Sequence, residues 1–528
     1  MQLDCKVSYI NKSELKSLLA SRLKDDTFTT LKELPNPSSF KDIHKATLRV
    51  LQAINTNEKI TIVGDYDVDG VVSTTIMVDF FKKLGITVDW IVPNRFKHGY
   101  GLSPKIVDKI NSGLIITVDN GISAIQSALL CKEKGLDLII TDHHTVGDEI
   151  PDCYAIINPK QNDCQFPYKE ICGAQVAWYF CASIKKALNQ NKNLMEFFDI
   201  LSIAIIADVM PMRSLNSTIV KKGLKMITTS TRPAIKTLNN HLKKHTINEE
   251  DIGFSIAPLI NCAGRMEDAS IAVEFLLSDN QNRAYEILEY LITLNNNRKE
   301  EQNNIFNQSL TQVNQDDQVI VVASKDWNEG IIGIVAAKLS EKFNKPSFVF
   351  SINGDTSKGS SRCNTDINLY NLLNSSKQMT IGFGGHKSAA GVVVQTDNLN
   401  NFKQEVNNNI NKLQNTSNED EIILDNTFNI NISDIDLETY NIIEEFRPYG
   451  LTNTSPEFIF NNITIQQQFF LGKDKLHQKL ILENNVELLI FNNTDYFNVN
   501  SQISFIATIS LNEFRGNITI NLILKRLI

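Results

Sequence analysis

The feature that most constrains the fold is a repeated pattern in which a short apolar run ends and acidic residues or histidine follow at once. The three pairs are Ile60 to Val63 with Asp65-Tyr-Asp-Val-Asp69, Leu114 to Val118 with Asp119-Asn-Gly121, and Leu136 to Thr141 with Asp142-His-His144. Segments with helical spacing separate the runs, at 71–84 and 122–134. This succession of strand, helix and strand is typical of an α/β fold with a parallel sheet covered by helices.

The rest of the chain predicts further domains, because 528 residues exceed what one hydrophobic core usually serves. A second strand, helix and strand series follows a long polar helix, and alternating short strands typical of a small β-barrel come last. The predicted divisions are a helical extension at 1–55, a parallel-sheet domain at 56–279, a connecting helix at 280–316, a smaller α/β domain at 317–413 and the barrel at 414–528. A polar linker is expected at 414–420.

Composition limits where the protein works and what it binds. A net charge of -8 argues against a surface coated in basic residues, so an anionic substrate needs a local binding site. Eight cysteines include no Cys-x-x-Cys pair, which indicates reduced thiols in a cytoplasmic protein. Neither a signal peptide nor a membrane span is expected, since the most apolar helix candidate, at 200–210, is short and contains Asp208.

The polar motifs predict a metal centre. Residues that follow parallel strands converge at one edge of the sheet, and several carboxylates cannot share a crevice unless positive charge lies between them. Carboxylates with one or two imidazoles favour Mn²⁺ or Mg²⁺, and two ions about 3.5 to 4 Å apart need a bridging carboxylate. Asp119 is the candidate bridge, and Asp208 is a candidate for the last ligand. Strand-like alternation would make Asp67 and Asp69 point the same way, with Asp65 behind them.

Each motif also has an ordinary structural interpretation. Asp-Asn-Gly is common in turns, and Asp-Val-Asp-Gly occurs in turns and in calcium-binding loops. Asp208 could simply end a helix. The shared position of the motifs after predicted strands is what favours the metal site over these alternatives.

Four motifs together resemble the DHH phosphoesterase superfamily, namely Gly64-Asp-Tyr-Asp-Val-Asp-Gly70, Thr117-Val-Asp-Asn-Gly121, Thr141-Asp-His-His144 and Ala207-Asp-Val-Met-Pro211. The resemblance runs from about residue 45 to the carboxyl terminus and is strongest to the members that degrade single-stranded DNA from the 5′ end. It implies that the metal ligands are Asp67, Asp69, Asp119, His143 and Asp208. It also implies that His144 contacts the scissile phosphate or assists the leaving group, with Asp65 and Arg265 in the same catalytic group.

The resemblance covers the later domains as well. Asn94-Arg95, Gly99-Tyr100-Gly101 and Asn261-Cys-Ala-Gly-Arg265 resemble segments that contact the substrate. Gly359-Ser-Ser-Arg362 and Gly382-Phe-Gly-Gly-His-Lys-Ser-Ala-Ala-Gly391 resemble the DHH-associated domain. The implied substrate-binding residues are Arg95, Tyr100, Asn261, Ser360, Arg362, Gly384, Gly385 and His386. An interdomain salt bridge is the alternative role for Arg265.

The last domain resembles an oligonucleotide-binding (OB) barrel, which grips single strands with basic residues and stacking aromatics. The candidates are Lys473, Lys475, His477, Lys479, Arg515, Phe469 and Phe470. A solvated surface is the alternative for the basic residues, and core packing is the alternative for the aromatics. Two positions depart from the usual family pattern, Leu259 in place of arginine and Asn328 in place of histidine.

The function expected from this resemblance is metal-dependent 5′-to-3′ exonuclease activity on single-stranded DNA, in repair and recombination. Expected partners are single-stranded DNA, a single-strand-binding protein and a helicase, with no membrane and a monomeric state. One rival is a DHH phosphoesterase that acts on short oligonucleotides, cyclic dinucleotides or pyrophosphate. The other rival is a non-catalytic DNA-binding scaffold, which would be expected to lack metal ligands.

Overall fold

The structure is a computed structural model that describes residues 9–413, 426–472, 475–493, 495–514 and 517–528. The predicted linker at 414–420, together with Lys473 and Arg515, lies outside the described residues. The chain divides into two compact units. One comprises Asn36–Asp208 and Lys225–Asp420, and the other comprises Met1–Pro35, Val209–Leu224 and Glu421–Ile528. The five sequence-based domain boundaries stay a prediction.

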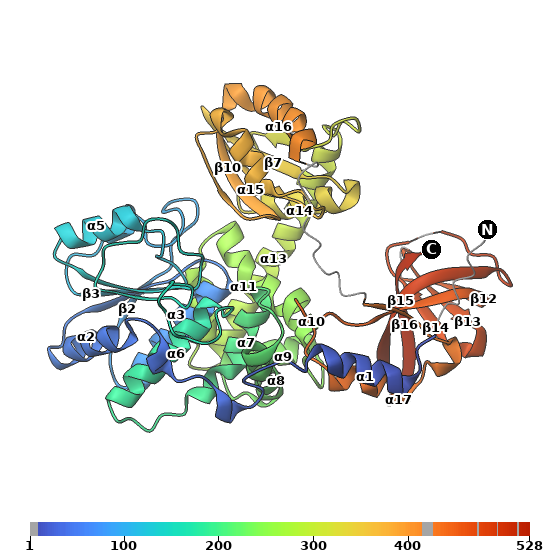
Figure 1. The fold of residues 1–528 in the computed structure, drawn as a ribbon, viewed down its shortest axis with the longest axis horizontal. Helices are drawn as coiled ribbons and strands as arrows, with labels where there is room; N and C mark the ends of the chain where they lie inside the picture. The colour runs from blue at the N-terminus through green and yellow to red at the C-terminus, as the bar shows by residue number, and fades with distance from the viewer. Residues whose placement is uncertain (1–8, 414–425, 473–474, 494, 515–516) are drawn as a thin grey trace. The chain divides into compact units, whose positions relative to one another are not determined.

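The first sheet is fully parallel, as the sequence pattern predicts. Its strands are β1 (Ile60–Val63), β2 (Asp89–Ile91), β3 (Leu114–Val118), β4 (Asp137–Thr141) and β5 (Ala155–Ile157), in the order β2-β1-β3-β4-β5. Every residue of β1, β3 and β5 is buried. Burial on both faces explains why these strands read as unbroken apolar runs. The helices of this part are α2 (Ile43–Asn55), α3 (Val68–Lys83), α4 (Pro104–Val107), α5 (Ile125–Glu133) and α6 (Gly173–Ala187), of which α2, α3, α5 and α6 are labelled around the sheet in Figure 1.

A group of helices follows the sheet in sequence. Its elements are η3 (Leu194–Phe197), α7 (Phe198–Ala207), α8 (Ser214–Thr229), α9 (Pro233–Leu242), α10 (Glu249–Asp251), η4 (Ile252–Ile256), α11 (Ala257–Met266) and α12 (Ser270–Leu276). Helix α7 is apolar over most of its length and buried from Phe198 to Ile205. It packs against α3 and so holds Asp208, the C-cap residue that follows it, at a fixed place.

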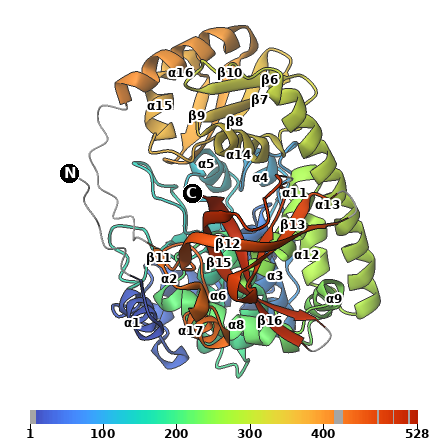
Figure 2. The same cartoon turned by 90° about the vertical axis from the view of Figure 1, so that its right-hand side faces the viewer.

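The predicted connecting helix is α13 (Gln281–Leu310), which Figure 2 shows running beside the smaller α/β domain. Its first half buries Ile287, Leu288, Leu291 and Leu294 and packs against α9, α11 and α12. Its second half contacts α14, where Ile305 joins the next hydrophobic core. The helix therefore connects the two α/β parts and also contributes to both cores.

The smaller α/β domain has a mixed sheet in the order β6-β7-β8-β10-β9. Its elements are β6 (Ile320–Ser324), α14 (Ile332–Phe343), β7 (Ser347–Asn353), β8 (Thr356–Arg362), α15 (Leu369–Ser375), η5 (Lys377–Met379), β9 (Gly382–Gly385), β10 (Ala389–Gln395), η6 (Thr396–Asn398) and α16 (Leu399–Leu413). Strands β6 and β7 pair parallel, and the remaining pairs are antiparallel. Gly359 is required in β8 because an added Cβ would lie 2.4 Å from the Phe350 ring.

The other unit is built on a β-barrel. Its elements are α1 (Lys12–Arg22), β11 (Thr427–Asn429), η8 (Ile432–Asp434), α17 (Leu437–Glu445), β12 (Glu457–Leu471), β13 (His477–Leu482), η9 (Glu483–Asn485), β14 (Glu487–Ile490), β15 (Gln502–Phe514) and β16 (Asn517–Leu527). The strand order is β11-β12-β13-β14-β16-β15, and pairing of β12 with β15 closes the barrel. Helix α1 packs on α17. Closure removes most sheet edges, as in an OB fold.

Two short turns, η1 (Leu31–Glu33) and η2 (Pro37–Ser39), lie between α1 and α2. Among the helices of the described residues, none has the length and apolar character needed to cross a membrane.

Candidate metal centre and substrate site

The first acidic motif spans the turn between β1 and α3. Strand β1 ends at Val63 and α3 begins at Val68, with Asp67 as its N-cap, so the strand-like alternation expected for Asp65, Asp67 and Asp69 is wrong. The Asp67 carboxylate accepts a hydrogen bond from the Gly70 amide at 3.0 Å, as N-cap residues do. An added Cβ at Gly70 would lie 2.6 Å from Asp65, so glycine lets the turn close tightly.

Asp69 is held by the start of α6, a helix more than a hundred residues further along the chain. Its carboxylate accepts hydrogen bonds from the Gly173 amide at 2.6 Å and the Ala174 amide at 2.9 Å. Free amides and the helix dipole at an N-terminus both favour a negative charge. These two amides are functional groups that the sequence analysis missed, because nothing near Asp69 in sequence indicates them.

The second motif ties two strand ends together. Asp119 has a left-handed backbone with φ of 63°. The Asn120 side-chain amide donates to the carbonyls of Val63, Gly64 and Val118, so it joins the end of β3 to the end of β1. The Asp-Asn-Gly sequence therefore forms a turn, and that turn also presents the Asp119 carboxylate.

The residues after the strands, together with Asp208, gather at one buried place. Three groups could each hold a metal ion, formed by Asp65, Asp67 and Asp119, by Asp119, His143 and His144, and by Asp69, His143 and Asp208. His143 Nε2 lies 3.2 Å from Asp119 Oδ1, 3.6 Å from Asp208 Oδ2 and 3.7 Å from Asp69 Oδ2. Asp119 belongs to two of the three groups, which suits the bridging position predicted for it.

The electrostatics of this site fit divalent metal ions. Burial and then the charges of neighbouring carboxylates raise the pKa of Asp65 and Asp119 well above the usual range, and that of Asp208 to about 9. Three buried atoms of this site have no hydrogen-bond partner among the described residues, Asp119 Oδ1, His143 Nδ1 and Asp208 Oδ2. Burial lowers the pKa of His143, which keeps its imidazole neutral as a metal ligand must be. Carboxylates with a neutral imidazole suit Mn²⁺ or Mg²⁺.

Asp142 positions the catalytic candidate His144. Its carboxylate accepts from the backbone amides of Ile122, His143 and His144 and contacts His144 Nδ1 at 2.7 Å. Burial alone would lower the pKa of His144, but the hydrogen bond to Asp142 and its charge raise that pKa to about 9. The other ring nitrogen lies 3.4 Å from the Tyr100 hydroxyl. His144 is therefore a cation at neutral pH that lies beside Tyr100, a predicted substrate-binding residue.

We expect Asp142→Asn to lower kcat by about 100-fold, within the range for a general acid or base. Loss of the carboxylate lowers the pKa of His144, so activity that needs the protonated ring should be lost at lower pH, and the alkaline limb of the kcat profile should move down. A pH profile of kcat measures this. In a His144→Ala background the same substitution should add almost nothing. A full further loss in that double variant would contradict the positioning role.

Three arginines from separate elements lie near the metal centre, and their positive charges are close enough to affect one another. Arg95 follows β2 and stacks over the Tyr66 ring at 4.2 Å. Burial and then the charges of Arg95 and Arg362 lower the pKa of Arg265 to about 10. None of the three forms a salt bridge with a carboxylate of the described residues. Such a group of cations without anionic partners is suited to a phosphate.

Arg265 does not act as an interdomain salt bridge within the described part of the chain. Its Nη1 donates to the carbonyl of Gly330 at 3.2 Å. An added Cβ at Gly330 would lie 2.0 Å from the Arg265 carbonyl oxygen, so the two α/β parts approach closely here. Arg362 donates to Ser360 Oγ at 3.2 Å and to the carbonyl of Ser361 at 2.8 Å.

The remaining predicted substrate residues occupy more open positions. Asn261 is half-buried on α11, and Tyr100 is exposed. Gly384 and Gly385 end strand β9, and His386 follows them with its side chain exposed. None of the potential metal groups in the described residues includes His386. The roles of these residues stay a prediction.

The two departures from the family pattern have structural roles. Leu259 is buried in α11, where it adds to the helix core. The Asn328 side chain accepts from the Gly330 amide at 2.8 Å, and its carbonyl accepts from the Ile331 amide, so it shapes the turn before α14. The apolar side chain and the turn-forming amide thus fit their local surroundings.

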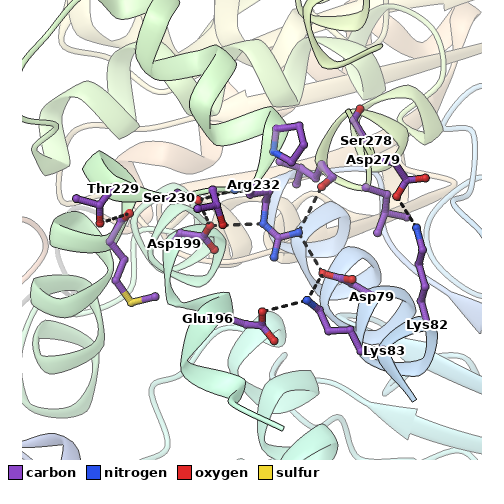
Figure 3. Close-up of a pocket in the computed structure, with 15 residues that line it drawn as sticks. Asp79, Lys82, Lys83, Glu196, Asp199, Thr229, Ser230, Arg232, Ser278 and Asp279 are labelled. Atoms are coloured by element: carbon purple, nitrogen blue, oxygen red, sulfur yellow. Dashed lines mark hydrogen bonds and ion pairs between the residues drawn. The ribbon is translucent and has the colours of Figure 1, made fainter. Parts of the chain in front are cut away.

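A separate cavity of about 360 Å³ lies beside the ends of α3 and α8, away from the metal centre (Figure 3). Its charged groups pair with one another. Arg232 lies 3.2 Å from Asp79, Lys83 lies 3.0 Å from Glu196, and Ser230 donates to Asp199 at 2.7 Å. Each of the three cations in the lining, Lys82, Lys83 and Arg232, pairs with a carboxylate, so the cavity offers no unpaired positive charge to an anionic ligand.

Family models match the three folded parts of the chain. The DHH family N-terminal domain matches residues 59–205, the DHHA1 domain matches residues 316–412 and the RecJ OB domain matches residues 428–526. Together these matches account for the parallel sheet, the mixed sheet and the barrel.

Curated proteins and solved structures agree with these matches. The chain is 30% identical to the single-stranded-DNA-specific exonuclease RecJ of Escherichia coli over 92% of this chain and 90% of that protein. It is 33% identical to RecJ of Bacillus subtilis over 93% of its own length, but spans only 64% of that relative. RecJ of Thermus thermophilus in complex with Mn²⁺ matches with a TM-score of 0.82 at 25% identity, covering 98% of this chain and 75% of that one. The chain therefore belongs to the RecJ family of the DHH phosphoesterase superfamily.

Proposed function

We propose that this protein hydrolyses phosphodiester bonds of single-stranded DNA from the 5′ end and releases mononucleotides. The observation that carries the proposal is a buried group of mutually repelling carboxylates beside three arginines that have no carboxylate partner in the described part of the chain. The first group suits divalent cations and the second suits a phosphate. The curated relatives are single-stranded-DNA-specific exonucleases, and Thermus thermophilus RecJ has been solved with Mn²⁺ and with Mg²⁺.

In this proposal the metal ligands are Asp67, Asp69, Asp119, His143 and Asp208, with Asp65 beside them. Two bound ions, Mn²⁺ or Mg²⁺, supply charge neutralisation at the phosphate and an activated water. His144, held by Asp142, donates a hydrogen bond to the scissile phosphate or to the leaving oxygen. Arg265, with Arg95 and Arg362, balances the charge that develops on the phosphate oxygens.

In this proposal the preference for single strands has two sources, the passage between the two α/β parts and a second DNA-binding surface on the barrel. The two α/β parts contact each other at Gly330 and Arg265, and in this proposal the path between them admits one strand and excludes a duplex. The barrel carries exposed Phe469 and Phe470, and Lys479 lies over the Phe469 ring at 5.7 Å. Exposed aromatics beside basic residues bind single strands by stacking and charge. Phe469 and Phe470, two of the predicted DNA-binding residues, are thus accessible enough to stack on bases.

We expect Arg362→Ala to raise KM for single-stranded DNA by about tenfold or more, because a charge-assisted contact to a phosphate contributes at least 1.5 kcal/mol or so. Arg362→Lys should recover only part of the loss, since lysine cannot bond bidentately. Initial rates over a range of DNA concentrations measure the effect. Arg283→Ala, which removes an exposed surface arginine, is the matched control and should leave KM unchanged. Equal KM values for both alanine variants would contradict the phosphate role.

A panel of substrates separates the proposal from its rivals. Single strands, duplex, a dinucleotide and pyrophosphate are each offered with Mn²⁺, Mg²⁺ or a chelator. The proposed exonuclease degrades single strands only with metal and leaves the duplex largely intact. Faster cleavage of the dinucleotide or pyrophosphate would favour a small-substrate phosphoesterase, and DNA binding without any cleavage would favour a scaffold.

The proposal also includes the location, oligomeric state and protein partners of this protein. We propose a cytoplasmic monomer that works in DNA repair and recombination with a single-strand-binding protein and a helicase. Light scattering of the purified protein tests the monomeric state, and binding assays with each partner protein test recruitment.

A further inference from the structure

Phe254 is unusually exposed for an aromatic residue of a well-packed helical layer. It lies in η4 (Ile252–Ile256), and 85% of its surface is accessible, the largest fraction for any large hydrophobic residue of the described chain. An added Cβ at the preceding residue, Gly253, would meet no atom within 4 Å, so the surface beside the ring is open. A single exposed aromatic needs no explanation by itself. The position of Phe254 relative to Arg265 is what indicates a functional role for the exposed ring.

The exposed face of this helix leads from Phe254 to the candidate catalytic arginine. Pro258, Asn261 and Arg265 recur at the spacing of one face of an α-helix, Phe254 precedes them in the adjoining turn, and each of the four is at least partly exposed. The residues between the last three are buried, as the continuous core of α11 requires. The segment Ile252–Ile256 is a π-helical turn, a feature that occurs often at functional sites. These four residues therefore form a strip, defined here as Phe254, Pro258, Asn261 and Arg265, of at least partly accessible positions that ends at the arginine group.

We infer that the single strand leaves the metal centre along this strip and stacks a base on Phe254. The inference rests on the proposed exonuclease function and adds a specific contact to it. Eleven residues separate Phe254 from Arg265, which places them about 16 Å apart along the helix. A stacked strand advances about 3.4 Å per nucleotide, so about five nucleotides span this distance, and fewer do if the strand is stretched. Stacking on an aromatic ring tolerates any base, as a nonspecific nuclease requires.

The inference makes the contribution of Phe254 depend on substrate length. A dinucleotide held at the metal centre is too short to reach the ring, whereas a 20-nucleotide strand passes over it. Phe254→Ala should therefore raise KM for the 20-nucleotide strand by about tenfold, within the range for loss of one stacked base, and leave kcat nearly unchanged. The same variant should cleave a 5′-phosphorylated dinucleotide with wild-type kcat and KM. Phe254→Trp should restore tight binding of the long strand, because tryptophan also stacks.

The test measures kcat and KM of the full-length wild type, Phe254→Ala, Phe254→Trp and Tyr285→Ala on both substrates with Mn²⁺. Tyr285→Ala removes an exposed aromatic of α13 outside the strip and should behave as wild type. An unchanged KM for the long strand in Phe254→Ala would overturn the inference. So would an equal loss on both substrates, because that result indicates a structural role. Failure of the wild type to cleave either substrate would instead overturn the proposed function.

Discussion

Asp119→Ala is expected to abolish cleavage of single-stranded DNA, with a fall in kcat of at least about 100- to 1,000-fold, the loss seen when one strong electrostatic partner is removed from an active site. Asp119 contributes to two of the three potential metal groups, so its loss affects both ion positions. Its Oδ1 is buried without a hydrogen-bond partner among the described residues.

The fold of this variant should survive, because the wild-type carboxylate is destabilising without metal. Burial and neighbouring carboxylates raise the pKa of Asp119, which means that its ionised form is disfavoured in the folded protein. Without metal, the melting temperature of Asp119→Ala should therefore equal or exceed that of the wild type. Added Mn²⁺ should raise the melting temperature of the wild type and leave the variant unchanged.

Thermal unfolding with and without Mn²⁺ measures both effects. Glu133→Ala on α5 removes an exposed carboxylate and is the matched control, expected to keep full activity and the full Mn²⁺ response. Residual nuclease activity of Asp119→Ala above about a tenth of wild type would contradict the role of this residue, since removal of a required partner costs far more.

Gly173→Ala is expected to lower kcat by about 100-fold, the loss that a displacement of about 1 Å at a reacting centre can cause. The added methyl group would lie 2.3 Å from Asp119 Oδ1 and 2.6 Å from the Asp119 Cβ. Asp119 or the start of α6 must shift to relieve this clash. Because the Gly173 amide also binds the Asp69 carboxylate, the shift disturbs a second candidate ligand.

The matched control for this variant is Gly147→Ala, where the nearest atom to an added Cβ is 3.7 Å away. Steady-state rates and the Mn²⁺-induced change in melting temperature compare the two. Gly147→Ala should match the wild type, while Gly173→Ala should lose both activity and the Mn²⁺ response. Normal activity of Gly173→Ala would show that the carboxylate position tolerates displacement and would contradict the proposed centre.

The sequence pattern predicts the first sheet well because its strands are short and buried on both faces. β1 and β3 have the predicted bounds, β4 begins one residue later than predicted, and polar residues follow each of them. The sequence pattern places the start of α3 at residue 71, three residues after its observed start at Val68. A strand-like alternation was expected where Asp67 begins the helix as its N-cap, although aspartate is a favoured residue at that position. Local chemistry could have corrected that prediction.

Other parts of the site could not be read from local sequence. The amides that hold Asp69 belong to α6, and the arginine group combines residues that follow β2, lie in α11 and end β8. These contacts depend on how distant elements pack. Helix α1 likewise buries Leu15 and Leu19 in the core of the barrel unit, a partner that its own polar sequence does not indicate.

A single-stranded oligonucleotide with different labels at its two ends tests the proposed activity most directly. In the presence of Mn²⁺ the 5′ label should appear first, as a mononucleotide, while the 3′ label remains on a strand that shortens with time. A chelator should stop both changes. Early release of the 3′ label, or cleavage first at internal positions, would contradict a metal-dependent exonuclease that works from the 5′ end.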